Sequence, residues 1–129
     1  MDTKKTIMVV DDNADMVTVT KTILEARGYS VIAANSAEEL FNRLEEQRPD
    51  LILLDIMMPQ MDGLLALRQL RGNPDTSSIP VMLVTAKVRY QDILAGYQQG
   101  ADYYLTKPFT SSQLVNGINI LLRDGGTPP

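Results

Sequence analysis

Five polar residues, each at or just after the end of a short apolar run, have the side-chain types that phosphoryl transfer uses. Asp11, Asp12 and Asp55 supply carboxylates, Thr85 supplies a hydroxyl group and Lys107 supplies a positive charge. Carboxylate oxygens without nitrogen or sulfur donors are the ligands that Mg²⁺ prefers. A bound Mg²⁺ and a lysine would neutralise the phosphoryl oxygens while a carboxylate attacks phosphorus. The set therefore predicts a site in which Asp55 is the nucleophile and Thr85 hydrogen-bonds one oxygen of the product.

Each of these residues also has an ordinary structural explanation when it is taken alone. Asp12 or Asn13 could cap the helix that follows them, and Asp55 could be a turn residue after its strand. Thr85 and Lys107 could stand at strand ends without any chemical role. The joint arrangement of an acid pair, a central aspartate, a hydroxyl group and a lysine is much more specific than any one of its members.

Short β-branched apolar runs alternate along the chain with helical patterns, and the runs are predicted to be buried strands. The expected strands are Thr6–Val10, Ser30–Ala34, Asp50–Leu54, Pro80–Val84 and Asp102–Leu105. Between them, apolar residues recur three or four residues apart, which predicts helices. The stripes are Met16, Val19 and Ile23; Ala37, Leu40, Phe41 and Leu44; Leu64, Leu67 and Leu70; Tyr90, Ile93, Leu94 and Tyr97; and Leu114, Val115, Ile118, Leu121 and Leu122.

The ends of these helices are marked by capping residues. Ser36 with Glu39, and Thr110 with Gln113, are predicted capping boxes at two helix starts. Glycines follow the other helical stripes and are expected to end them, because glycine adopts the left-handed cap conformation readily. These are Gly28, Gly72 and Gly100.

The alternation of strands and helices predicts an α/β fold, a doubly wound parallel sheet with helices on both faces. Ligands of such sheets bind at the carboxyl ends of the strands. The first and third strands are expected to be neighbours, which brings Asp55 close to Asp11 and Asp12. We expect one domain over residues 1–122, with residues 123–129 a flexible tail or the start of an interdomain linker.

The composition excludes several other kinds of chemistry. The 129 residues contain no cysteine and no histidine, so thiolate and histidine metal sites, cysteine nucleophiles, serine–histidine triads and phosphohistidine on this chain are excluded. A net charge of −4 gives no electrostatic reason to bind nucleic acid or an anionic membrane. The apolar runs are too short to span a bilayer, and the N-terminus lacks the pattern of a secretory signal, so we expect a cytoplasmic protein.

Four motifs occur in the order and at the spacing of one known family. They are Met8-Val9-Val10-Asp11-Asp12-Asn13, Asp55-Ile56-Met57-Met58-Pro59 with Asp62-Gly63, Val84-Thr85-Ala86-Lys87, and Tyr104-Leu105-Thr106-Lys107-Pro108-Phe109. Through these motifs, residues 5–122 resemble the response-regulator receiver domain of two-component and phosphorelay signalling. The resemblance implies a five-stranded sheet in the flavodoxin-like order 2-1-3-4-5.

The resemblance implies a phosphorylation-dependent signalling switch, which catalyses only its own phosphorylation and dephosphorylation. A sensor histidine kinase or a histidine phosphotransfer protein would donate a phosphoryl group to Asp55, and an output domain or partner protein would read the result. Mg²⁺ would be held by Asp11, Asp12, Asp55 and the backbone carbonyl of Met57, with Asp11 acting partly through water. Lys107 would pair with Asp55 and later with the phosphate.

Further roles follow from the same resemblance. Thr85 and Tyr104 would move together and change the surface of the fourth helix, fifth strand and fifth helix, although Tyr104 could instead simply pack on the fourth helix. The Lys107–Pro108 peptide bond would be cis. Met57 and Lys87 would overhang the site and tune the attack of water on the acyl phosphate. Since Met57 cannot orient water, we expect a moderately long-lived phosphorylated state.

Partner recognition in the family lies mostly along the first helix. Met16, Val17, Thr20 and Lys21 are therefore the residues that we expect to present a partner face there.

Two other interpretations remain open. A small phosphatase of the haloacid-dehalogenase kind also uses an aspartyl phosphate and Mg²⁺, but it needs a second aspartate where Met57 stands and a cap domain that does not fit this length. A receiver-like scaffold with an unused site would keep the fold without the chemistry, and the intact acid, hydroxyl and lysine set disfavours it. No output domain follows residue 122, so we expect either a stand-alone receiver or the N-terminal part of a longer regulator or sensor protein.

Overall fold

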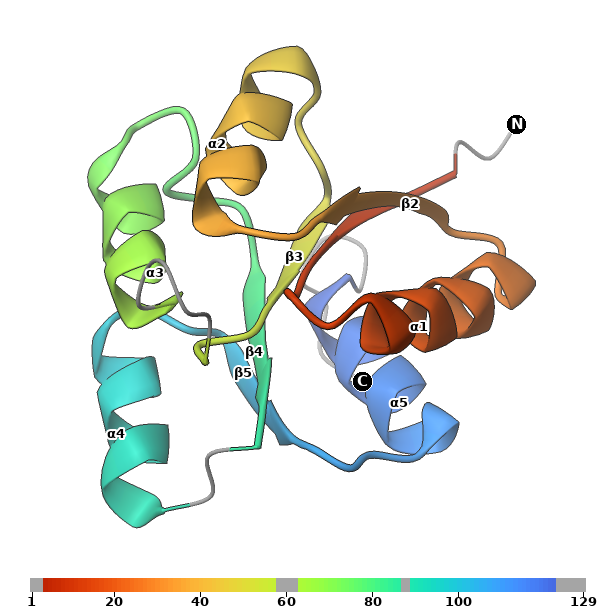
Figure 1. The fold of residues 1–129 in the computed structure, drawn as a ribbon. Helices are drawn as coiled ribbons and strands as arrows, with labels where there is room; N and C mark the ends of the chain where they lie inside the picture. Colours follow the sequence, from red (N-terminus) through yellow and green to blue (C-terminus); the bar gives the residue numbers. More distant parts are fainter. Residues whose placement is uncertain (1–3, 58–62, 87–88, 123–129) are drawn as a thin grey trace.

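The computed structural model describes residues 4–57, 63–86 and 89–122. Within these residues, five parallel strands form one sheet in the order β2-β1-β3-β4-β5, which is the predicted order (Figure 1). The strands are β1 (Thr6–Val10), β2 (Ser30–Ala34), β3 (Leu51–Leu54), β4 (Val81–Thr85) and β5 (Tyr103–Thr106). All their carboxyl ends therefore meet at one edge of the sheet.

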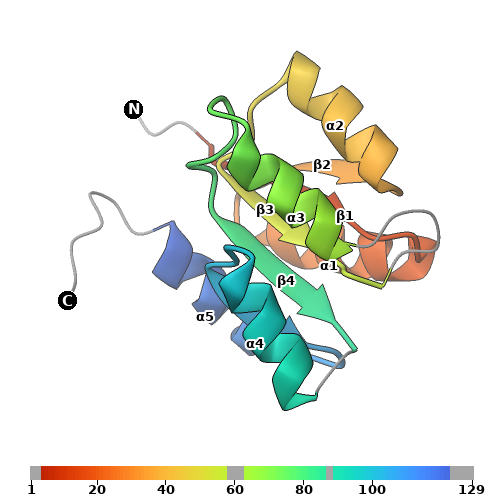
Figure 2. The same cartoon turned by 90° about the vertical axis from the view of Figure 1, so that its left-hand side faces the viewer.

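Helices cover both faces of this sheet, as predicted. On one face lie α1 (Ala14–Ala26) and α5 (Ser111–Leu121). On the other face lie α2 (Ala37–Glu46), α3 (Gly63–Gly72) and α4 (Tyr90–Gln98), as Figure 1 and Figure 2 show. In the part of the chain that the structure describes, none of these helices has the length and apolar character needed to cross a bilayer.

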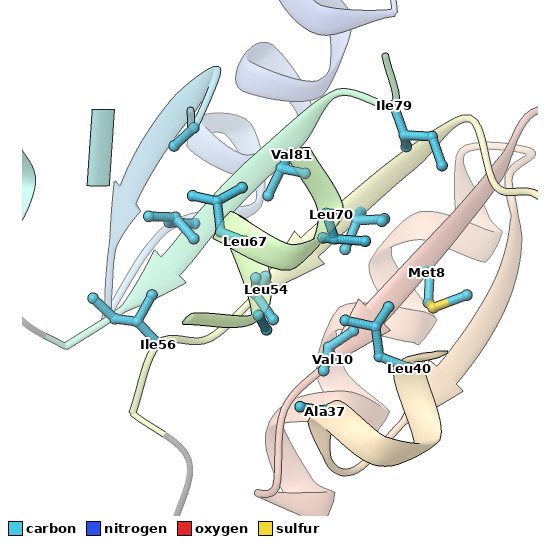
Figure 3. Packing of buried hydrophobic residues seen from close by; sticks show 14 of the residues in the cluster. Met8, Val10, Ala37, Leu40, Leu54, Ile56, Leu67, Leu70, Ile79 and Val81 are labelled. Carbon is cyan, nitrogen blue, oxygen red and sulfur yellow. The ribbon is translucent and has the colours of Figure 1, made fainter. Parts of the chain in front are cut away.

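The core consists of two layers, one on each face of the sheet, because successive side chains of a strand point in opposite directions. Ile7 and Val9 of β1 pack with residues of α1 and α5. Met8 and Val10 of the same strand pack with residues of α2 and α3 (Figure 3). All four side chains are at most 4% exposed, so the interior strand β1 is covered on both faces.

Side-chain caps set the starts of three helices. The Asn13 side chain accepts a hydrogen bond from the Met16 backbone N–H, which identifies Asn13 rather than Asp12 as the cap of α1. Thr110 and its partner Gln113 form the predicted capping box of α5. At α2, Ser36 accepts from the Glu39 backbone N–H, but the Glu39 carboxylate accepts from Asn35 N–H, 2.6 Å away. The predicted box at α2 is therefore wrong in its second half.

Three strands begin one residue later than predicted, because the preceding residue has another role. Asp50 accepts a hydrogen bond from the backbone N–H of Thr6 at the edge of the sheet, at 2.7 Å. Asp102 accepts from the backbone N–H of Val81 at 2.9 Å. Pro80 has no N–H to contribute to a ladder. These residues complete the N-terminal edge of the sheet instead of extending its strands.

Helix α4 forms where it was predicted, but most of the apolar stripe that predicts it lies on the surface. Tyr90, Leu94 and Tyr97 are 76%, 41% and 46% exposed. Gly96 is the buried residue of α4, and a Cβ placed on it would lie 2.7 Å from the side chain of Leu83 in β4. The helix thus approaches the sheet through a glycine and leaves its larger apolar side chains outside.

Arg71 ties the end of α3 to the loops that precede β4 and β5. Its guanidinium group donates to the carbonyls of Gly100 and Ile79 at 2.9 and 2.7 Å, and to the Asp102 carboxylate at 2.8 Å. These bonds hold the N-terminal end of the β4–β5 pair, the end opposite to Thr85. The sheet is thereby anchored away from the edge that carries the predicted site.

We predict that Leu67→Ala lowers the free energy of unfolding by about 2 to 5 kcal/mol, because it leaves a cavity in the layer under α3. Leu67 is 0% exposed, whereas Leu65 on the same helix is 44% exposed. Leu65→Ala is the matched control and should cost much less. Urea denaturation of both variants measures the difference, and equal losses would contradict the assignment of the core.

Candidate functional site

The carboxyl ends of β1 and β3 bring two buried aspartates side by side. Val10, the last residue of β1, pairs with Leu54, the last residue of β3. Asp11 directly follows β1, and Asp55 directly follows β3. The backbone N–H of Asp55 donates to the carbonyl of Val10 at 3.0 Å, which fixes the relative height of the two residues. Asp11 and Asp55 are only 5% and 6% exposed. Carboxylates this close and this desolvated repel each other unless a positive charge lies nearby.

Asp12 adds a third carboxylate on the solvent side. One carboxylate oxygen each from Asp11, Asp12 and Asp55 can be chosen so that all three lie within 4.8 Å of one another. Asp12 is exposed, whereas the other two are buried. The structure therefore brings together the three acidic residues that the sequence analysis expected to converge.

The two buried carboxylates are oriented by their own loops. Oδ1 of Asp11 accepts from the backbone N–H of Asn13 at 3.0 Å. Oδ1 of Asp55 accepts from the backbone N–H of Met57 at 2.8 Å. In both aspartates, Oδ2 remains for a second interaction, and in both cases that interaction is with Lys107.

Lys107 bridges the two aspartates with its ammonium group. Nζ lies 2.6 Å from Oδ2 of Asp11 and 3.0 Å from Oδ2 of Asp55. The backbone N–H of Lys107 donates to the carbonyl of Thr85 at 2.8 Å, and the Lys107–Pro108 peptide bond is cis. Burial acts to lower the pKa of Lys107, but its hydrogen bonds to Asp11 and Asp55 and their negative charges outweigh burial and raise that pKa above its usual value. Lys107 therefore stays charged and compensates part of the acidic cluster.

The donor set fits a hard divalent cation. The cluster offers three carboxylates against one ammonium group, so it carries an excess of negative charge. Every donor in it is oxygen, which matches Mg²⁺ and not the nitrogen or sulfur sites of zinc. The open side faces solvent at Asp12, where water molecules can complete an octahedral shell.

Thr85 and Tyr104 lie on the neighbouring strands of the same edge. Thr85 ends β4, is 0% exposed and pairs in register with Thr106 of β5. The Tyr104 ring lies against α4: its centroid is 6.5 Å from that of Tyr97, and a Cβ on Gly96 would lie 3.2 Å from it. Burial first, and then the charges of Asp92 and Asp55, raise the pKa of Tyr104. Tyr104 therefore packs on the fourth helix in this structure, and its switching role stays a prediction.

The structure describes one of the two predicted tuning residues, Met57, and not the other, Lys87. Met57 is 51% exposed beside Asp55. Lys87 lies outside the described residues, as do Pro59, Asp62 and the tail 123–129.

Gly63, which the sequence analysis noted only as part of a motif, lies directly beneath the site: a Cβ there would be 2.6 Å from the carbonyl oxygen of Asp55. Only glycine fits this contact without moving the loop that holds Asp55.

A small cavity below the aspartates includes residues that sequence reasoning did not assign to the site. Besides Asp11 and Asp55, its lining includes Met16 and Thr20 of α1 and Phe109. Thr20 is 4% exposed, so its place in the predicted partner face of α1 is wrong: it faces inward, beneath the carboxylates. The predicted stripe of α1 contains Val19, which is 52% exposed, and nothing in residue type or spacing indicated that its neighbour Thr20 faces inward instead.

Comparison with known families gives one identification. Residues 7–119 match the response regulator receiver domain family. The match covers most of the chain, and the chain therefore belongs to this family. It is a phosphorylation-dependent signalling module of two-component regulatory systems, in which the acidic cluster stands at the site that the fold predicts.

Individual relatives and solved structures are consistent with this family. The chain is 40% identical over 119 residues to the alkaline phosphatase synthesis transcriptional regulatory protein PhoP of Bacillus subtilis, covering 92% of this chain and 49% of PhoP. It is 35% identical to the DNA-binding response regulator MtrA of Mycobacterium tuberculosis, covering 100% of this chain and 56% of MtrA. The chain thus spans about half the length of the curated relatives that it matches.

Among solved structures, the signal receiver domain of a signal transduction histidine kinase from Syntrophus aciditrophicus is 34% identical with a TM-score of 0.87. That comparison covers 97% of this chain and 95% of the other. A two-component response regulator from Clostridium difficile is 27% identical with a TM-score of 0.89, covering 96% of this chain and 100% of the other. Receiver domains with this fold therefore occur both in response regulators and in histidine kinases.

We predict that the stabilising effect of Lys107 is lost only in strongly alkaline solution. The folded protein raises the pKa of Lys107, so its contribution is complete below the ordinary lysine pKa of about 10.4 and is lost as pH rises through the higher folded value. Lys107→Met should lower the free energy of unfolding by about 1 to 3 kcal/mol near neutral pH. The difference from wild type should be constant between about pH 7 and 9 and shrink above about pH 10.5.

Denaturation at a series of pH values measures this difference, with Lys21→Met as the control at an exposed lysine of α1. A difference that changed between about pH 7 and 9 would contradict the account of Lys107.

Proposed function

We propose that Asp55 is the phosphoacceptor of this receiver domain and that a phosphohistidine on a sensor histidine kinase or a histidine phosphotransfer protein is the donor. The observation that carries the proposal is the bridge of Lys107 between Asp11 and Asp55, at 2.6 and 3.0 Å, inside a cluster of three carboxylates. A lysine held there compensates negative charge at the point where a phosphoryl group would arrive. The 129 residues contain no histidine, so the phosphohistidine that donates the group lies outside them.

The chemistry follows from the two oxygens of Asp55. One carboxylate oxygen attacks phosphorus, the bond from phosphorus to the donor nitrogen breaks, and the imidazole leaves with the electron pair of that bond. The negative charge of the transferred group then lies beside the Lys107 ammonium group, which is already within hydrogen-bond distance of Asp55. The hydroxyl group of Thr85, at the end of β4, would donate a hydrogen bond to one phosphoryl oxygen.

Mg²⁺ is the proposed cofactor. Asp12 and Asp55 would bind it directly, Asp11 partly through water, and the backbone carbonyl of Met57 would complete the protein ligands. When bound, Mg²⁺ would neutralise phosphoryl oxygens and orient them for in-line transfer. The three carboxylates of the cluster support this assignment, because without a cation they repel one another.

Signal output is proposed to start at Thr85 and Tyr104. Movement of Thr85 toward the phosphate would leave space that Tyr104 fills by rotating, and this would change the surface of α4, β5 and α5. That surface carries little charge: within Tyr90–Gln98 the one charged residue is Asp92, and Ser111–Leu121 has none. A partner protein or output domain would therefore read the change through apolar and hydrogen-bonding contacts.

We propose that the reaction is confined to this chain's own phosphorylation and dephosphorylation. A haloacid-dehalogenase-type phosphatase would need a carboxylate where Met57 stands, which argues against activity on other substrates. We take residues 1–122 as the receiver unit and residues 123–129 as a flexible tail or the start of an interdomain linker, in a protein that works in the cytoplasm. The half-length matches to PhoP and MtrA support an output domain outside this chain.

We predict that incubation with acetyl phosphate and Mg²⁺ adds one phosphoryl group to the intact protein. Asp55→Asn should abolish the mass increase, since an amide is a far weaker nucleophile than a carboxylate. Asp75→Asn, at an exposed loop aspartate away from the cluster, should label like wild type. Intact mass spectrometry measures both. Labelling of Asp55→Asn at the wild-type level would rule out Asp55 as the acceptor, and no labelling of wild type would favour the scaffold interpretation.

We also predict that Asp12→Asn weakens Mg²⁺ binding by roughly tenfold or more, because it removes a charged ligand from the cation site. Asp15→Asn is the control, since Asp15 is an exposed aspartate in the first turn of α1 and outside the cluster. Isothermal titration calorimetry with Mg²⁺ measures both affinities. An unchanged affinity of Asp12→Asn would remove Asp12 from the ligand set.

A further inference from the structure

Methionine is the main residue through which this chain can respond to mild oxidants. The sequence has seven methionines but no cysteine and no tryptophan. Of the methionines that the structure describes, Met8 and Met82 are 0% exposed and Met16 is partly buried. Met57 is 51% exposed. A thioether reacts with peroxide in proportion to its access to solvent, so Met57 is the reactive one of these four.

Met57 is also held at the phosphoacceptor. It stands two residues after Asp55, and its backbone N–H donates to Oδ1 of Asp55 at 2.8 Å. This bond fixes the position of the Met57 backbone relative to the carboxylate. The half-exposed Met57 side chain therefore starts from a backbone that is bonded to the carboxylate of Asp55, next to the acidic cluster.

We propose that Met57 is a redox modification site, at which oxidation by hydrogen peroxide to the sulfoxide shortens the lifetime of the phosphorylated state. The proposal rests on the assignment of Asp55 as phosphoacceptor. In the reaction, the thioether sulfur donates an electron pair to one peroxide oxygen. The O–O bond breaks, an S–O bond forms, and the second oxygen leaves as water after proton transfer. Sulfur is oxidised by two electrons and the peroxide is reduced by two.

The effect on lifetime follows from hydrogen bonding. A thioether is a weak acceptor and leaves water near an acyl phosphate without orientation. A sulfoxide oxygen is polar and accepts a hydrogen bond from water, so it can hold a water molecule beside the phosphoryl group. One added hydrogen bond to the attacking water corresponds to a faster hydrolysis by about two- to tenfold. Methionine sulfoxide reductases reverse the modification, which makes the site a reversible input to the switch.

The experiment compares decay of the phosphorylated state before and after peroxide treatment. Peptide mapping first measures sulfoxide at Met57 against Met8 and Met82, the buried internal references. Each sample is then loaded with acetyl phosphate and Mg²⁺, the donor is removed, and loss of the phosphoryl group is followed by intact mass. Oxidised wild type should lose phosphate about two- to tenfold faster than untreated wild type, and treatment with a methionine sulfoxide reductase should restore the slower rate.

Two variants separate Met57 from other oxidised methionines. Met57→Leu cannot form a sulfoxide, so its decay after peroxide should equal its own decay without peroxide. Met57→Gln carries a permanent amide oxygen and should decay faster than Met57→Leu without any peroxide.

Three results would overturn the inference while leaving the proposed function intact. They are equal decay of oxidised and untreated wild type, an equal acceleration by peroxide in Met57→Leu, and no preference for Met57 over Met8 and Met82 in the oxidation itself. Failure of untreated wild type to accept a phosphoryl group would instead overturn the assignment of Asp55, and this inference with it.

Discussion

The electrostatic balance at the carboxyl edge of the sheet is the constraint on which the rest of this structure depends. Asp11 and Asp55 are buried next to each other, and Asp12 adds a third carboxylate. Burying one such group without a partner is costly, and burying two together is more so. Lys107 compensates part of this charge by direct contact with both buried aspartates. The remaining excess of negative charge would attract a cation, and a bound cation would offset the charge of an incoming phosphoryl group.

The fold supplies this balance through parallel topology. Neighbouring strands β1 and β3 deliver the two buried aspartates to the same height, and β4 and β5 deliver Thr85 and the segment that holds Lys107. The opposite edge is closed by side chains, with Arg71 joining α3 to the loops before β4 and β5. A rigid edge at one end and a charged, partly open edge at the other suit the proposed switch, in which a change at Asp55 would be passed to α4 and β5.

Much of this arrangement could be predicted from the sequence, since it depends on residue type and local spacing. The sheet order followed from a resemblance, and the convergence of Asp11, Asp12 and Asp55 followed from strand ends meeting at one edge. What could not be predicted depends on contacts between distant segments. Strand β3 starts one residue later than predicted because the Asp50 carboxylate accepts a hydrogen bond from the backbone N–H of Thr6, 44 residues away. The α4 stripe is exposed because Gly96 takes the contact with Leu83. Thr20 is buried and lines the cavity beneath the aspartates together with Phe109, 89 residues away in the chain. None of these contacts has a periodic signal.

The measurement that tests the central claim most directly is the chemical localisation of the phosphoryl group. Borohydride reduces an aspartyl phosphate to homoserine, whereas free aspartate and phosphate esters of serine, threonine or tyrosine do not react in this way. After loading and reduction, peptide mapping should find homoserine at position 55 and unmodified aspartate at positions 11 and 12. Homoserine at position 11 or 12, or a phosphoryl group retained on a hydroxyl side chain, would contradict the account.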